Sequence, residues 1–299
     1  LNSESLEGAD HDGRDADSRL VDHYVRTFAP QTSFLMSTGN GGFGYGTNAP
    51  PSPVVAMGIA ASTQFGSTGG ESISDTMQIT YGDITPFSNR GPSADGRNGV
   101  SVAANGDNGT GAEPVNFMGD GAASLALWGG TSRSCPVAAG VMTLVYQAFH
   151  EKHERWPTWQ EAQAILMSGA RYAGYDTFTM GAGVVDAADA VRIASGRHGI
   201  YSVPPAWTPG SYRGTTYEAF ARLVEHGQSV TGSITLRNPA SAPVDVSLSA
   251  ATPRLLASHE MSLTTDLASE SPASPVPDYL LEVPLEAIPE GTELMVVRG

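Results

Sequence analysis

Residues 129–150 restrict the fold of this chain more than any other segment. The segment opens with two glycines, a threonine and Ser132, and from Cys135 to His150 it is rich in valine, alanine and glycine, with apolar side chains on every side of a helix. A helix that is apolar all round belongs in the interior of a protein. The sequence therefore predicts a central buried helix with a serine at its N-terminal end.

The rest of the first 199 residues alternates strand and helix patterns. Apolar runs at residues 32–39 and 54–62 predict buried strands, and a loop rich in glycine and proline separates them. An amphipathic helix is expected from about Asp17 or Ser18 to Phe28. Two more helices are expected, at residues 158–170 and 186–196. Such alternation is typical of an α/β layer fold with a mainly parallel sheet.

The composition changes near residue 200, where residues 201–214 are rich in proline and glycine. Beyond this junction, apolar and polar residues alternate between turn signals, which predicts strands. These strands are expected at residues 228–238, 244–252, 279–285 and 293–299. We therefore predict two domains, residues 1–199 and a β-sandwich-like accessory module at residues 200–299, which is expected to be incomplete at its C-terminal end.

Charge and composition exclude some partners. The formal net charge of −15 disfavours a nucleic acid or an anionic membrane surface as partner, because phosphates would be repelled. The chain has no apolar run of the ~20 residues that cross a bilayer. Its single cysteine, Cys135, cannot form an internal disulfide and is expected to be a small buried hydrophobe. The sequence therefore predicts neither a nucleic-acid partner nor a contact with a membrane.

No cofactor and no metal site are predicted. The acidic stretch at residues 10–17 offers four aspartates, Asp10, Asp12, Asp15 and Asp17. It lacks a glycine at the sixth position and a glutamate at the last position, where a calcium-binding helical loop has them. A solvated acidic lead-in to the first helix is the preferred interpretation.

Ser132 is the first candidate catalytic residue. At a helix N-terminus, a serine lies beside unsatisfied backbone N–H groups and the positive end of the helix dipole, so it can attack a carbonyl while its own amide faces the developing oxyanion. The alternative is an ordinary helix cap. The whole string Gly130-Thr131-Ser132-x-Ser134-x-Pro136-x-x-Ala139-Gly140 resembles the nucleophile signature of subtilisin-like serine proteases, the subtilases.

A second segment, FLMSTGNGGFGYGT, begins at Phe34 and resembles the subtilase segment in which a strand ends in glycine and asparagine. This resemblance implies that the Asn40 amide is the second oxyanion donor. It also implies that Ser37, Thr38 and Gly39 form one wall of the pocket for the residue preceding the scissile bond. The alternative is a simple turn, because Asn-Gly is a common turn dipeptide.

A third segment, beginning at Thr85 with TPFSNRGPSADG, resembles the subtilase pattern FSSRGP and is closest to the tripeptidyl-peptidase II-like branch. The resemblance covers about residues 18–195. It implies the three-layer subtilisin fold, hydrolysis of peptide bonds through an acyl-enzyme, and an extended peptide or protein substrate that pairs beside the site. It also favours a secreted or cell-envelope location.

The chain departs from the family pattern in its catalytic partners. A subtilase serine needs a histidine and an aspartate to activate it, and none of the seven histidines lies in the family's HGTH-like context. We interpret all seven as surface residues. The resemblance implies that both partners precede residue 1, so the chain is expected to be the C-terminal portion of a longer protease. The alternative is a pseudoenzyme, a non-catalytic binding scaffold.

Two smaller departures lie near the candidate site. Arg133 follows Ser132 where the family usually has methionine, and it is expected to add positive charge near the leaving-group side. Asn105 stands where the family usually has proline, which concerns only the rigidity of that loop.

Overall fold

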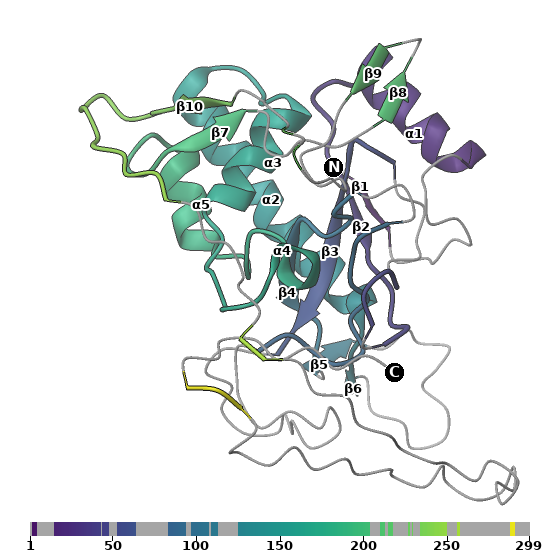
Figure 1. Ribbon diagram of the computed structural model, residues 1–299. Coiled ribbons are helices and arrows are strands. Elements are labelled where there is room, and N and C mark those ends of the chain that lie inside the picture. Colours follow the sequence, from purple (N-terminus) through teal and green to yellow (C-terminus); the bar gives the residue numbers. More distant parts are fainter. Residues whose placement is uncertain are drawn as a thin grey trace, which may run out of the picture. The chain divides into compact units, whose positions relative to one another are not determined.

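The computed structural model describes residues 2–4, 15–42, 44–47, 53–63, 83–93, 97–107, 109–112, 125–203, 210–212, 215–217, 227, 229, 234–249, 256–257 and 288–290. The chain divides into two units, residues 1–244 and 245–299. In the second unit, the described residues form neither helix nor strand. All of the described helices and strands therefore belong to the first unit (Figure 1).

The centre of the first unit is a parallel sheet with the strand order β1-β2-β3-β4. Its strands are β1 (Asn2–Glu4), β2 (Phe34–Ser37), β3 (Ala56–Ser62) and β4 (Val102–Asn105). β2 and β3 fall inside the two predicted apolar runs, which confirms the parallel α/β architecture. β1 was not predicted because its residues are polar, and polar residues enter a strand only when a neighbouring strand pairs with them.

Helix α2 (Thr131–His153) packs on the sheet against β2, β3 and β4. Its buried residues recur at helical spacing and include Cys135, Met142 and Phe149. On the opposite face, Val137 is 38% exposed and Leu144 is 46% exposed. The prediction of a helix buried on all sides is therefore wrong. The apolar composition of α2 suggested more burial than the structure shows, because the sheet and the neighbouring helices cover only one face of this helix.

The other helices start at polar caps, and all but one of them agree with the prediction. They are α1 (Ala16–Thr27), α3 (Trp159–Ser168), α4 (Thr177–Met180) and α5 (Ala187–Ala194). Asp15, Thr158 and Asp186 accept hydrogen bonds from first-turn N–H groups of α1, α3 and α5, respectively. Only the four-residue α4 was not predicted. None of the described helices is both long and apolar enough to cross a bilayer.

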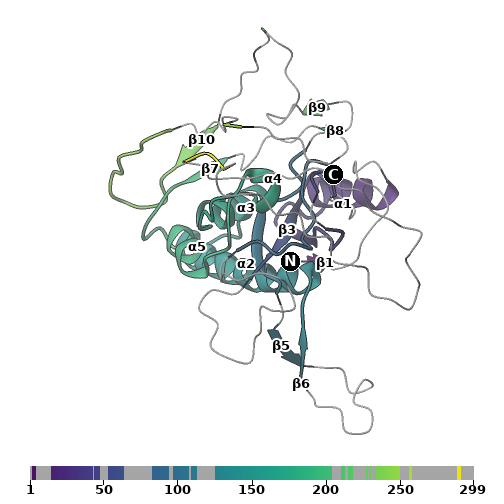
Figure 2. The same ribbon diagram turned by 60° about the horizontal axis from the view of Figure 1, so that its bottom comes forward.

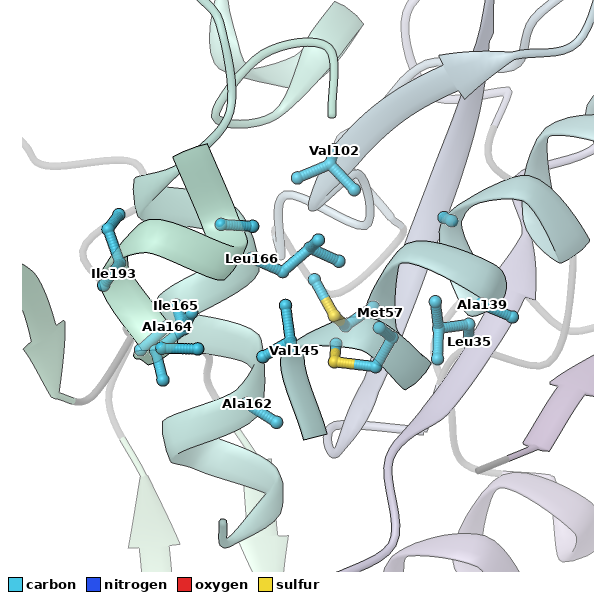
Figure 3. Close-up of a cluster of buried hydrophobic side chains, with 14 of the residues drawn as sticks. Leu35, Met57, Val102, Ala139, Val145, Ala162, Ala164, Ile165, Leu166 and Ile193 are labelled. Carbon is cyan, nitrogen blue, oxygen red and sulfur yellow. The ribbon is translucent and has the colours of Figure 1, made fainter. Parts of the chain in front are cut away.

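The main hydrophobic core lies where α2, α3 and α5 meet one face of the sheet. Figure 2 shows α3 and α5 beside α2, and Figure 3 shows side chains from these helices meeting those of the strands. Met57 and Ile59 belong to this core, whereas Ala60 belongs to a smaller cluster on the other face of the sheet. This alternation is the period of two expected of a strand with both faces covered.

Three small antiparallel pairs complete the described strands. They are β5 (Gly109–Ala112) with β6 (Leu125–Trp128), β7 (Tyr201–Val203) with β10 (Thr235–Arg237), and β8 (Gly210–Tyr212) with β9 (Thr215–Tyr217). The Tyr201 side chain lies in the main core, so β7 packs with the helices of the first unit.

The predicted accessory module is described only in part. A strand at residues 235–237 falls within the predicted run 228–238. Residues 244–249 are exposed and form no strand, so the strand predicted there is wrong over those residues. Its alternating pattern alone does not supply the partner strand that a ladder needs. The strands expected at residues 279–285 and 293–299 lie outside the described residues. The sandwich and the boundary at residue 200 stay predictions.

Candidate active site

The start of α2 lies beside loops from the carboxyl ends of two strands. Gly130 has φ = 120°, a conformation that side chains other than glycine rarely adopt. Its N–H donates to the Gly106 carbonyl over 2.7 Å, directly after β4. This turn joins β6 to α2 and makes Thr131 and Ser132 the first two residues of the helix. In open parallel sheets, ligands bind beyond the carboxyl ends of the strands.

Asn40 is bound to the same helix start from β2. Its Oδ1 accepts from the Thr131 backbone N–H over 2.8 Å and from the Thr131 hydroxyl over 3.0 Å. The Thr131 Oγ1 also accepts from the Gly39 N–H over 3.1 Å. Because Oδ1 is held by Thr131, the amide nitrogen is the donor end that Asn40 offers beside α2.

The structure brings the two predicted catalytic residues together. Asn40 bonds to the residue that immediately precedes Ser132, although 91 positions separate Asn40 from Thr131. Thr131 is buried, whereas Ser132 is half-buried and Asn40 is exposed. The two predicted catalytic residues are thus accessible to solvent, and Thr131, which connects them, is not. This arrangement can present a hydroxyl and an amide donor to one carbonyl group.

The predicted pocket wall is more enclosed than the catalytic pair. The side chains of Ser37 and Thr38 are fully buried at the end of β2, and the Thr38 N–H donates to the Ile59 carbonyl over 3.2 Å. The buried Ser37 hydroxyl has no hydrogen-bond partner within the described part of the chain. Gly39 is also buried and has φ = 93°. The role of these three residues in substrate binding stays a prediction.

Arg133 and Asn105, the two smaller departures from the family pattern, bind each other. Arg133 Nη1 donates to Asn105 Oδ1 over 3.1 Å and also to the Asp107 backbone carbonyl. A Cβ atom at Gly109 would lie only 1.9 Å from this guanidinium. The Arg133 cation therefore connects the first turn of α2 to the loop between β4 and β5, as Gly130 also does.

The described histidines differ from the prediction in their exposure. His150 stacks on Trp156 with ring centroids 4.1 Å apart, and His153 packs on Phe149 at 4.2 Å. Both are half-buried, as is His23 against Phe28, so these three lie at the surface but are less exposed than the sequence predicted. Each of these rings is partly covered by an aromatic ring within six positions of it in the chain. Burial, and then the Arg155 cation, lowers the pKa of His153. His198 is exposed, and His11, His226 and His259 lie outside the described residues.

Two smaller expectations concern Cys135 and metal binding. Cys135 is fully buried in the main core, which confirms its interpretation as a small hydrophobe. Asp15 caps α1 by accepting from the Ser18 N–H over 2.8 Å, so this aspartate serves as a helix cap. Asp10 and Asp12 lie outside the described residues. Among the residues that the structure describes, no three acidic, histidine or cysteine side chains form a metal-binding group.

Comparison with known proteins decides the family. The model of the subtilase family, Peptidase S8, matches residues 3–185, which is more than half of the chain. The chain belongs to the subtilase family. Its α/β fold with a parallel sheet is the subtilisin-like fold, as the sequence resemblance implied. No curated protein matches the chain significantly. The match does not address the tripeptidyl-peptidase II-like branch, which stays a prediction.

Solved structures of proteases are similar to this subtilase at low sequence identity. The patellamide maturation protease PatA is 18% identical with a TM-score of 0.47, and the alignment covers 64% of this chain and 60% of that one. A lanthipeptide protease is 19% identical with a TM-score of 0.42, and coverage is 58% and 54%. A protease from Pseudoalteromonas arctica is 21% identical with a TM-score of 0.44, and coverage is 64% and 50%. The chain thus spans between half and three fifths of these structures.

Sequence reasoning missed the residues that hold the site together. Thr131 stood inside the nucleophile motif and Asn89 stood inside the third motif, but neither received a role. The available signal was their place in those motifs. Their partners are 91 and 48 positions away in the chain, so their hydrogen bonds can be seen only in the folded protein.

Proposed function

We propose that this subtilase chain provides the nucleophile and an oxyanion donor of a serine peptidase. Ser132 is the nucleophile and the Asn40 amide is the donor. The hydrogen bond from the Thr131 N–H to Asn40 Oδ1 carries the proposal, because it fixes Asn40 beside the first turn of the helix that bears Ser132. The match to the subtilase family supports the same chemistry.

The reaction proceeds through an acyl-enzyme. Ser132 Oγ attacks the carbonyl carbon of the scissile peptide bond while a base takes its proton, and the carbonyl oxygen becomes an oxyanion. The Ser132 N–H and the Asn40 amide stabilise that charge. The C–N bond then breaks as the base returns the proton to the leaving amine. Water, deprotonated by the same base, hydrolyses the ester and restores the Ser132 hydroxyl.

The base and the aspartate that orients it come, in this proposal, from sequence preceding residue 1. His150 and His153 support this part of the proposal because they lie at the opposite end of α2 from Ser132. His150 is 18 residues further along the helix, a separation of about 27 Å at roughly 1.5 Å per residue. A general base has to reach the serine hydroxyl within a hydrogen bond, so neither residue can act there.

The substrate is an extended peptide or protein segment. We propose that it lies along residues 37–39, at the carboxyl end of β2. The described backbone there continues from the sheet into the candidate oxyanion loop, so a strand-like substrate can follow it.

The first test measures covalent labelling by a fluorophosphonate probe. The 299-residue chain alone should be labelled very little, because losing one triad member costs up to ~10⁶ in turnover. The protein that includes the preceding segment should be labelled at Ser132. Ser132→Ala should abolish labelling, and Ser168→Ala, an exposed serine on α3, is the matched control that should retain it.

Peptide hydrolysis tests the oxyanion donor in the same longer protein. Asn40→Ala should keep probe labelling but lower kcat by ~10²–10³-fold. Strong labelling of the 299-residue chain alone would show that one of its own histidines is the base. A longer protein that folds but is not labelled at Ser132 would instead support the binding scaffold.

A further inference from the structure

We propose that Asn89 is a positioning residue that holds the oxyanion donor Asn40 in place. This inference rests on the proposed role of Asn40. Asn89 does not touch the reacting atoms in this proposal, and it acts only through the backbone of the loop that carries Asn40.

Asn89 bonds to the residues on both sides of Asn40. Its backbone N–H donates to the Gly39 carbonyl over 3.0 Å, and its side-chain Oδ1 accepts from the Gly41 N–H over 2.6 Å. Asn89 is only 2% exposed, so these bonds are shielded from water. One buried residue thus fixes the main chain immediately before and immediately after the proposed donor.

Gly41 permits this contact. A Cβ atom at position 41 would lie 2.9 Å from Asn89 Oδ1, closer than real Cβ atoms approach their neighbours. A further bond of 3.1 Å, from the Gly42 N–H to the Phe87 carbonyl, extends the attachment by one residue. The loop after β2 therefore follows the segment at residues 87–89 over several hydrogen bonds.

The segment that carries Asn89 is itself attached to β3. The Ser88 hydroxyl accepts from the Ala61 N–H over 3.0 Å, and the Thr85 N–H donates to the Ala61 carbonyl over 3.0 Å. Thr85 and Ser88 are fully buried. Hydrogen bonds therefore attach the segment of Asn89 to β3, and Asn89 attaches that segment to the loop that carries Asn40.

Two independent contacts therefore hold Asn40. Thr131 holds its side-chain oxygen, and Asn89 holds its backbone. A hydrogen-bond donor stabilises an oxyanion fully only when it is held within a few tenths of an ångström of the productive geometry. Releasing the Gly41 N–H should let the loop relax and should reduce transition-state stabilisation more than substrate binding.

The test uses peptide hydrolysis by the longer protein that contains the triad. Asn89→Leu removes the acceptor at similar size and should lower kcat by ~10–100-fold, with KM changed by less than about 2-fold. Asn89→Asp keeps an acceptor oxygen for the Gly41 N–H and should recover most of kcat. Gln163→Leu is the matched control: it removes a buried bond from α3 to the Val55 carbonyl, which lies before β3 at the opposite end of the sheet from Asn40, and it should lower thermal stability with kcat unchanged.

A double variant separates positioning from general folding. Because Asn89 acts through Asn40, Asn89→Leu should lower kcat by less than about 2-fold in an Asn40→Ala background. An equal loss in both backgrounds, or a change in KM alone, would overturn the proposal. If Asn89→Leu does not fold, Gly41→Ala disturbs the same contact from the other side and should lower kcat with Asn89 intact. An Asn40→Ala variant with full kcat would instead reject the proposed function itself.

Discussion

Thr131 makes the hydrogen bonds that join the two halves of the candidate site. Its hydroxyl donates to Asn40 Oδ1 and accepts from the Gly39 N–H, so it uses both capacities of one buried oxygen. The side chain is 0% exposed, which excludes water as a substitute partner. At the scale of single residues, the site therefore depends on one hydroxyl that neither attacks nor binds the substrate.

Replacement of this hydroxyl by a methyl group should destabilise the protein. Thr131→Val leaves the Gly39 N–H without its acceptor, so the free energy of unfolding should fall by about 1–3 kcal/mol. Thr131→Ser keeps the hydroxyl and should lose much less. Urea unfolding of the three proteins measures the difference. Equal stability of the valine and serine variants would contradict this role of the hydroxyl.

The start of α3 combines a helix cap with two ion pairs. Glu161 accepts from the Thr158 N–H over 3.0 Å, which completes a capping box, and its carboxylate pairs with Arg155 at 2.8 Å and with Arg237 at 3.3 Å. The hydrogen bond from Arg155, ahead of the bond from Thr158, lowers the pKa of Glu161 from 4.5 to about 2. Because Arg237 belongs to β10, this carboxylate also connects α3 to a strand 76 positions away.

This depressed pKa predicts how stability depends on pH. The carboxylate is favoured in the folded state, so its contribution is present above about pH 4.5 and is lost as the pH falls towards 2. Glu161→Gln keeps the capping box but removes the charge. It should lower the free energy of unfolding by about 1–2 kcal/mol at pH 7, a value reduced because both arginines are half-exposed to solvent.

Denaturant unfolding at pH 7 and at acid pH checks this difference. The difference in the free energy of unfolding between wild type and Glu161→Gln should decrease steadily below pH 4.5. The double variant Arg155→Ala with Glu161→Gln should cost little more than Glu161→Gln alone, since the pair is already broken. A difference in the free energy of unfolding that stays constant down to pH 2 would show that the ion pairs do not stabilise the fold.

At the scale of the whole molecule, one core connects the helices to the sheet. Cys135 lies in this core, one turn after Ser132, and its side chain is 0% exposed. It is also the only cysteine in the chain. Its thiol therefore reports on the integrity of the core that supports the candidate site.

Cys135 should react with a thiol reagent only when the first unit unfolds. Native protein should show almost no reaction, and protein in concentrated urea should react with one thiol per chain, because the thiolate has to reach solvent to attack. A Cys135→Ala variant is the control and should not react in either state. Rapid reaction of the native protein would mean that α2 separates from the sheet far more often than its burial indicates.

Local sequence patterns determined three helices and two strands of the sheet, and resemblance to a subtilase motif identified the candidate nucleophile. Helices α1, α3 and α5 were predictable because a polar cap and apolar spacing act over a few residues. β2 and β3 were predictable as apolar runs between turn signals. The pairing of Ser132 with Asn40 came from resemblance to the subtilase motifs, and the fold then placed Asn40 against Thr131.

Tertiary structure alone decided what the same patterns could not. The sequence of α2 shows apolar residues on all sides, but sheet and helices cover one face and leave Leu144 46% exposed. The polar β1 became a strand because β2 pairs with it. Asn89 reached Gly41 because β3 holds both segments together. Each of these outcomes depends on contacts between distant parts of the chain. The propensities of neighbouring residues contain no information about which distant segment will pack against them in the folded protein.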